Sequence, residues 1–270
     1  MSNANRYERL IEHIFFKYYK AGMTAVDFER QDIDTSARKL KIKLPKNLGD
    51  LIYSFRYRTD LPERIRNCAP GRQQWIIRPA GRSRYRFVAA DITIIEPNPQ
   101  LAQTKIPNAT PGLIAKYALN DEQALLAKLR YNRLIDIFTG VTCYSLQSHL
   151  RTTAPGVGQV ETDEVYIGVD KRGAHFVFPV QAKGGRDKIN AVQIEQDLAM
   201  SAAKFPHALC RPIAAQFMDD DLIALFELEQ VAVKSVKRIV VAAERHFLLV
   251  PPENLSAEEI LQYNQRTEHS

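Results

Sequence analysis

The chain has 270 residues, of which 45% are hydrophobic and 25% are charged, and its formal net charge is +6. This length and apolar content suffice for sizeable cores and predict two domains, and no apolar run approaches the ~20 residues of a membrane-spanning helix. The three cysteines have no CxxC spacing, which is typical of reduced thiols, so we expect a cytoplasmic protein that does not insert into a membrane.

The first 95 residues predict three helices and a hairpin. Apolar residues recur at helical spacing from Arg6 to Lys20, a shorter helical stretch is expected from Thr24, and a third helix is expected from Lys46 to Arg58. The β-rich runs 75–78 and 85–88 flank a turn loaded with arginine. This order of elements resembles a winged helix-turn-helix domain, which implies DNA binding.

Positive charge is concentrated in this region. Between Arg38 and Arg86 there are fourteen Lys or Arg residues against three acids, a net charge of +11, so the rest of the chain carries −5. A basic region joined to an acidic-leaning one suggests that the first holds a polyanion while the second acts on it. The alternative is a basic α+β module that docks on the second domain or binds RNA.

The winged-helix resemblance also implies how double-stranded DNA would be held. The third helix would enter the major groove, and the hairpin would form a wing on the backbone or in the minor groove. The residues that we expect to contact DNA are Lys46, Arg56, Arg58, Arg78, Arg82, Arg84 and Arg86.

A proline-rich segment divides the chain. Residues 96–112 contain four prolines among polar residues, which predicts an extended linker. We therefore expect a winged-helix-like α+β domain at residues 1–95 and a second domain at residues 113–270.

Several elements are expected in the second domain. A helix is expected from Asn120 to Gly140, and a second helix follows Asp187, its expected N-cap. Strands are expected at 212–217 and 231–241. The segment Ser256–Glu259 has the spacing of a capping box, which predicts one last helix.

The most informative segment lies between these helices. Two β-rich runs, 161–168 and 178–185, are separated by charged residues and Gly173, which predicts an antiparallel hairpin. Because side chains alternate along a strand, Gln181 and Lys183 share one face of the second run.

On the first run of this hairpin, alternation makes Asp163 the best-placed carboxylate. Glu164 points to the opposite face unless a bulge re-aims it. A carboxylate, a carboxamide and an ammonium at the end of a buried sheet must each find a partner, because each loses water there. A hard divalent cation is such a partner, and Mg²⁺ is held by one or two carboxylates together with substrate phosphates.

Asp163 followed across a hairpin by Gln181-x-Lys183 resembles the PD-(D/E)xK nuclease superfamily, the restriction-endonuclease-like fold. The resemblance covers roughly residues 120–241, whose expected order of helix, three-stranded meander, helix and strand is that of the superfamily. Two positions depart from the pattern: Thr162 stands in place of proline, and Gln181 replaces the commoner acid. Glutamine there is a known variant whose carbonyl oxygen can still ligate a metal.

The resemblance implies an α/β fold, a mixed sheet flanked by helices, and a role for each residue. Asp163 would be the principal metal ligand, Gln181 the second ligand, Glu164 a reserve ligand, and Lys183 the residue that orients the attacking water. The expected cofactor is Mg²⁺, with Mn²⁺ possible, and the expected activity is that of a type II restriction-like DNA endonuclease. Because two strands are cut, we expect a homodimer.

Two other functions fit the same residues. The nuclease fold could be retained in a DNA-binding regulator without activity, a possibility that Gln181 keeps open. The chain could also be a repair or junction nuclease that reads the shape of DNA.

Individual residues also have simpler interpretations. Asp163 and Glu164 could form a solvated strand end, with Lys183 an ordinary surface lysine. For Glu122, in the first turn of a helix, an interaction with the helix dipole is the commoner explanation. For His149, contact with a phosphate together with Arg151 is one interpretation, and a histidine at a helix end is the commoner one.

Overall fold

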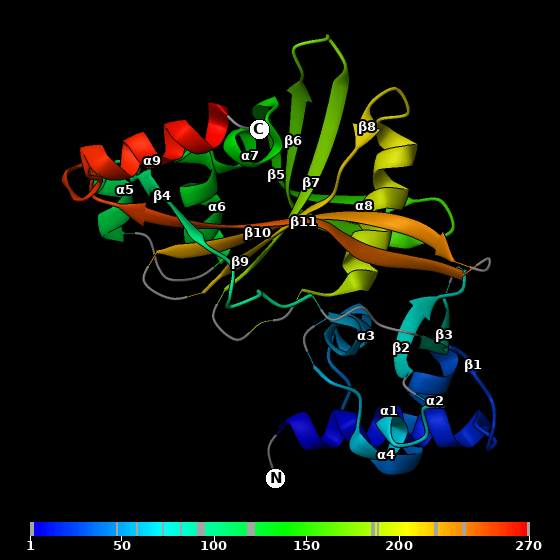
Figure 1. The fold of residues 1–270 in the computed structure, drawn as a ribbon. Helices are drawn as coiled ribbons and strands as arrows, with labels where there is room; N and C mark the ends of the chain where they lie inside the picture. Colours follow the sequence, from blue (N-terminus) through cyan, green and yellow to red (C-terminus); the bar gives the residue numbers. More distant parts are fainter. Residues whose placement is uncertain are drawn as a thin grey trace. The chain divides into compact units, whose positions relative to one another are not determined.

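The computed structural model describes residues 3–46, 48–57, 59–71, 73–81, 83–90, 95–117, 122–184, 187, 189–218, 221–233 and 236–268. The chain is a mixed α/β protein that divides into two units (Figure 1). The first unit comprises residues 1–93 with 152–160, and the second comprises residues 94–151 and 161–270. Among the helices in the described ranges, none is long and apolar enough to cross a membrane.

The first unit combines helices with a small sheet. Its elements are α1 (Asn3–Tyr18), β1 (Ala25–Glu29), α2 (Arg30–Leu40), α3 (Leu48–Tyr57), α4 (Glu63–Arg66), β2 (Gln74–Pro79) and β3 (Arg84–Ala90). The strands form an antiparallel sheet in the order β1-β3-β2. The helix expected at 6–20, the third helix and the hairpin are therefore confirmed.

The prediction of a helix from Thr24 was wrong. Residues 25–29 form β1, in which Val26 and Phe28 are buried while Asp27 and Glu29 are exposed. This alternation has the period of a strand that covers a core on one face. Helix α2 begins only after Glu29, which forms a capping box with Asp32.

The core of the first unit is formed by the apolar faces of its helices and one face of its sheet. Phe15 of α1 lies at its centre, with its ring 5.0 Å from that of Trp75 and 5.1 Å from that of Phe87. Edge-to-face aromatic pairs of this kind add stability beyond the area that they bury. The core therefore holds α1 against both strands of the β2–β3 hairpin.

The second unit contains a large mixed sheet with helices on both faces. Its elements are β4 (Gln103–Pro107), α5 (Gly112–Tyr117), α6 (Glu122–Tyr131), α7 (Leu134–Thr139), β5 (Thr142–Ala154), β6 (Gly158–Val169), β7 (His175–Lys183), α8 (Ala191–Lys204), β8 (Leu209–Cys210), β9 (Ile213–Phe217), β10 (Leu222–Val233), β11 (Val236–Val250), the 3₁₀ helix η1 (Pro252–Asn254) and α9 (Ala257–Glu268).

The strand order of this sheet is β4-β11-β10-β9-β7-β6-β5, with β8 paired to β7. Strands β6 and β7 are antiparallel, as expected for the hairpin, whereas β7 and β9 are parallel and are joined through α8. The described elements thus follow the expected order of helix, three consecutive strands, helix and strand.

Two cores lie on opposite faces of the sheet. Alternate residues of the central strands separate into two groups, so that Ile213 and Ala215 pack with α6 and α7, whereas Ala214 packs with Ile194 of α8. Because both faces are covered, the central strands read as nearly continuous apolar runs. Polar side chains inside this sheet therefore need partners from one of the two helical layers.

The expected linker is partly a strand of the second unit. Within residues 96–112, β4 pairs in parallel with β11, from Gln103 opposite His246 to Pro107 opposite Val250. The prolines remain compatible with pairing because β4 lies at the edge of the sheet, where a missing N–H is tolerated.

Three element boundaries also differ from the predictions. The helix expected at 120–140 is interrupted after α6, where buried Asn132 donates from Nδ2 to the carbonyl of Lys128 and Arg133 has a φ of 52°. The N-cap of α8 is Asn190, whose Oδ1 accepts from the N–H of Val192 at 2.8 Å, and not Asp187. The strand expected at 231–241 is instead the end of β10 and the start of β11.

Gly168 offers a test of the packing between β6 and its neighbours. A Cβ at this position would lie 2.7 Å from Cγ1 of Val141 and 2.9 Å from Cε2 of Phe178, closer than van der Waals contact allows. We expect Gly168→Ala to lower the free energy of unfolding by about 1–3 kcal/mol, because the core must shift to admit a methyl group. Urea denaturation followed by circular dichroism measures this change.

Gly112→Ala is the matched control, since nothing lies within 4 Å of the Cβ it would add. Equal urea midpoints for Gly168→Ala and the wild-type protein would contradict the packing described above.

Candidate active site

Asp163 lies near the open end of the β6–β7 hairpin. Its side chain is buried, and Oδ2 accepts a hydrogen bond from the backbone N–H of Ala182 at 2.8 Å. The Nζ atom of Lys183 lies 3.8 Å from the same oxygen. The structure therefore brings together the acid and the lysine that the sequence singled out.

Glu122 extends this pair. It is the first residue of α6, and burial, the negative charge of Asp163 and a hydrogen bond with it raise the pKa of Glu122 to about 7, although the charge of Lys183 acts in the opposite direction. Two acids held this close resist simultaneous ionisation unless a cation lies between them. Glu122 therefore interacts with Asp163 in addition to standing in the first turn of α6.

His149 completes the group. Single ligand atoms of Glu122, His149 and Asp163 all lie within 4.8 Å of one another. His149 belongs to β5 and not to a helix end, and it has a φ of 49°, in the left-handed region that a histidine adopts only at a cost. Its Nε2 also pairs with the side chain of Gln123. Strained residues of this kind cluster at functional sites.

Gln181 points into a different network. Its Nε2 donates to Oδ2 of Asp197 at 2.9 Å, and its Oε1 accepts from Nε2 of Gln193 at 3.2 Å. The carbonyl that we expected to ligate a metal thus has a protein partner. The hydroxyl of Thr162 donates to the other carboxylate oxygen of Asp197.

Sequence reasoning missed Asp197. It is fully buried on α8, and burial raises its pKa to about 7. The available signal was its register, because Asp197 stands three residues from both Ile194 and Met200 on the buried face of the helix. An acid in an apolar stripe needs a polar partner, and the predicted sheet offers Gln181 as one.

Glu164 lies on the opposite face of the sheet from this network. Its fully buried carboxylate accepts two hydrogen bonds from Nη2 of Arg130, at 2.8 and 2.7 Å, and others from Ser145 and Ser148. Alternation predicted that Glu164 points away from Asp163, but both carboxylates contact residues of α6, Arg130 and Glu122. The expected role of Glu164 as a reserve ligand is not supported by its position, because its oxygens are already bound to α6 and β5.

Strand β6 departs from regular alternation around Asp163. Thr162 contacts Asp197 of α8, whereas Glu164 contacts Arg130 of α6, although residues two apart on a regular strand face the same side. Asp163 lies at this irregularity, where its carboxylate reaches the N–H of Ala182 and the end of α6.

The expected DNA-binding residues lie on α3 and the β2–β3 hairpin. Lys46 is exposed just before α3, Arg56 is half-buried in α3, and Arg78 is half-buried in β2. Arg58 and Arg82 lie outside the described residues.

Arg84 and Arg86 are held by acids of β1. The Nε of Arg86 lies 2.6 Å from Oδ1 of Asp27, and the Nε of Arg84 lies 3.3 Å from Oε1 of Glu29. Because these side chains are largely exposed, water screens both ion pairs and each adds little to stability. A phosphate can therefore compete for both arginines.

Comparison of the chain with models of protein families, with curated proteins and with solved structures found no match. The functional interpretation therefore rests on the residues described above.

The pKa of Glu122 provides a test of this site. Between about pH 4.5 and pH 7 the folded state binds more protons than the unfolded state, so stability falls as the pH rises through this range. Glu122→Gln cannot ionise, so we expect it to be more stable than wild type by about 1 kcal/mol at pH 8 in EDTA, allowing for the partial exposure of this carboxyl.

At pH 4 the two proteins should have nearly the same urea midpoint, because the wild-type carboxyl is then protonated. A difference of the same size at both pH values would indicate a change in packing and would contradict the proximity of the two acids.

Proposed function

We propose that the chain is a metal-dependent endonuclease that hydrolyses phosphodiester bonds in double-stranded DNA. The observation that carries the proposal is the convergence of Glu122, Asp163 and Lys183, two acids and an amine, from α6, β6 and β7. Two carboxylates that approach each other in a half-buried position are a natural site for a divalent cation. A lysine beside them suits a reaction in which negative charge develops on a phosphate.

The donor set fits the expected Mg²⁺. Carboxylate oxygens are its preferred protein ligands, and Glu122 and Asp163 would supply them. His149 adds an imidazole, a donor that first-row transition ions accept more readily than Mg²⁺ does. When bound, such an ion would offset charge on the phosphate and lower the pKa of a water molecule.

Other residues of the site would orient the metal ligands and the attacking water. The Ala182 N–H and the Lys183 ammonium fix the orientation of the Asp163 carboxylate. Lys183 Nζ would hold the attacking water or donate a hydrogen bond to a phosphate oxygen, since an ammonium has three donors and only one direction is used by Asp163. Glu122, with a pKa of about 7, would give up its proton as a cation binds.

The architecture supports the proposal. The order α6, β5, β6, β7, α8 and β9, with β9 parallel to β7, resembles the core of the PD-(D/E)xK superfamily. In that family the catalytic acid and lysine lie on the second and third strands of the meander, the positions of Asp163 on β6 and Lys183 on β7.

The first unit would bind the DNA. Its element order, with sheet order β1-β3-β2, resembles a winged helix, in which α3 would enter the major groove and the β2–β3 hairpin would serve as the wing. Phosphate contacts would give this unit a strongly salt-dependent affinity. Cleavage of both strands would require two active sites, and therefore a homodimer, as in type II restriction enzymes.

A DNA-binding regulator without nuclease activity is the second candidate. The favouring observation is the carboxamide of Gln181, whose two ends are bound by Asp197 and Gln193. While Asp197 and Gln193 bind the Gln181 side chain, a metal centre lacks the second acid of the superfamily pattern unless Glu122 supplies that ligand.

Cleavage assays separate these functions. We expect purified protein to cut a mixed panel of unmethylated and methylated plasmids in Mg²⁺ or Mn²⁺ and to be inactive in EDTA. Lys183→Ala and Asp163→Asn should each lower the rate by at least about a hundredfold, because they remove charge next to the reacting phosphate.

Lys171→Ala, in the turn of the same hairpin, is the control and should cleave like the wild-type protein. Discrete fragments would indicate restriction of specific sites, whereas cleavage only at forks or junctions would indicate repair. If no metal supports cleavage while gel-shift binding persists, the regulator is the correct function.

A second prediction concerns the arginines of the wing. Asp27→Asn should tighten binding to a DNA duplex by up to about fivefold at low salt, because Arg86 loses its protein partner. Arg86→Ala should weaken binding and reduce the slope of log affinity against log salt by about one. Fluorescence anisotropy at several salt concentrations measures both effects.

Glu253→Gln, which removes one exposed acid from η1, controls for the change in net charge. If it tightens binding as much as Asp27→Asn does, the wing makes no specific contribution.

A further inference from the structure

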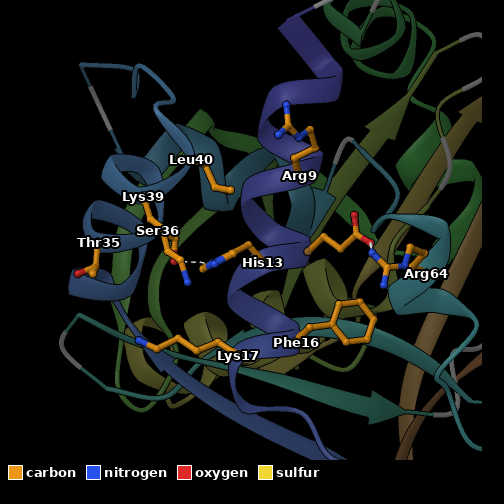
Figure 2. Close-up of a pocket in the computed structure, with 10 residues that line it drawn as sticks. Arg9, His13, Phe16, Lys17, Thr35, Ser36, Lys39, Leu40 and Arg64 are labelled. Atoms are coloured by element: carbon orange, nitrogen blue, oxygen red, sulfur yellow. Dashed lines mark hydrogen bonds and ion pairs between the residues drawn. The ribbon is translucent and has the colours of Figure 1, made fainter.

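A cavity lies within the first unit, between α1, α2 and α4. Its volume is about 570 Å³, within the range of small-molecule binding sites. In Figure 2, side chains of α1 and α2 face each other across the cavity, and His13 points toward Ser36. Of the candidate DNA-binding residues that the structure describes, none lines it.

Positive charge dominates the lining, and part of it is uncompensated. Lys17 is paired with Asp32 at 2.7 Å, and Arg64 is paired with Glu12 at 2.5 Å. The two other cations of the lining, Arg9 of α1 and Lys39 of α2, form no ion pair with any residue in the described ranges.

His13 lines the same cavity and is close enough to Lys39 and Lys17 to feel their positive charges. Its Nδ1 is hydrogen-bonded to the hydroxyl of Ser36 at 3.1 Å, which leaves Nε2 available. Partial burial and the charges of Lys39 and Lys17 lower the pKa of His13, because each disfavours a further positive charge. An anion in the cavity would reverse this effect and accept hydrogen bonds from His13 and Lys39 together.

Two hydroxyl-bearing residues, Thr35 and Ser36, and two apolar residues, Phe16 and Leu40, complete the lining. Phe16 and Leu40 are partly buried at the cavity, and the guanidinium of Arg64 lies over the Phe16 ring, 5.0 Å from its centroid. A ligand that fits this lining carries a concentrated negative charge at one end and a flat or apolar body at the other.

We propose that this cavity binds a nucleotide. The phosphate is held by Arg9, Lys39 and His13, and the sugar and base lie against Phe16 and Leu40. The nucleotide is either free in solution or the 5′-phosphorylated end of a DNA strand, since both present the same group. This site is separate from the groove-binding residues of α3 and the wing, and the proposal does not depend on nuclease activity.

Titration of the full-length protein tests the proposal. Isothermal titration calorimetry with dAMP should show saturable binding at one site per chain. Lys39→Ala and Arg9→Ala should each weaken dAMP by about tenfold or more, because each removes a charged hydrogen-bond donor to the phosphate. Lys20→Ala removes an exposed lysine just beyond α1 and outside the cavity, and it should bind dAMP as the wild-type protein does.

A second arm distinguishes the two sources of the nucleotide. A single-stranded oligonucleotide with a 5′-phosphate is compared with the same strand bearing a 5′-hydroxyl, each with wild-type protein and Lys39→Ala. A preference for the phosphorylated end that Lys39→Ala removes, without binding of free dAMP, identifies the strand end as the ligand.

Other outcomes overturn the proposal. Inorganic phosphate that binds as tightly as dAMP would mean that the apolar wall contributes nothing, so that the ligand is not a nucleotide. The same conclusion follows if neither dAMP nor the phosphorylated end binds, or if Lys20→Ala weakens binding as much as Lys39→Ala. Circular dichroism of each variant identifies any loss of binding that is caused by unfolding.

Discussion

The placement of the candidate site depends on one constraint, the burial of polar side chains on both faces of a covered sheet. Thr162 is held by Asp197 on one side, and Glu164 is held by Arg130 on the other. If either side chain left its partner, a buried polar group would lose its hydrogen bond, which would cost several kcal/mol. Strand β6 is therefore fixed in an irregular course, and Asp163 is presented to Lys183 and Glu122 as a result.

The site thus combines two groups of polar side chains, a hydrogen-bonded structural network and a cluster of candidate metal ligands. Asp197, Gln181 and Gln193 form a buried network whose donors and acceptors serve mainly one another. Glu122, His149 and Asp163 instead share a space with more acceptors than donors. A buried hydrogen-bond network rigidifies its surroundings, whereas an excess of negative charge creates a demand for a cation. The first group can therefore act as the support on which the second is built.

Much of this arrangement could be predicted from local patterns. The β6–β7 hairpin follows from its turn residues, and the proximity of Asp163 to Lys183 follows from the pairing of these two strands. The roles of Glu122, His149 and Asp197 could not be predicted, because they depend on which helix covers which face and on the irregular course of β6. The same limit explains β1, where alternation over only five residues was mistaken for the start of a helix.

The pairing of β4 with β11 has a consequence for dividing the chain into its parts. A fragment that starts at residue 113 would lack β4 and leave residues 246–250 of β11 unpaired on one side, with N–H and C=O groups open to other chains. Such a fragment would tend to self-associate even if its core were intact. A fragment that starts near residue 95 keeps β4 paired with the end of β11, so the boundary that the prolines suggest is not the boundary at which the second unit is best isolated.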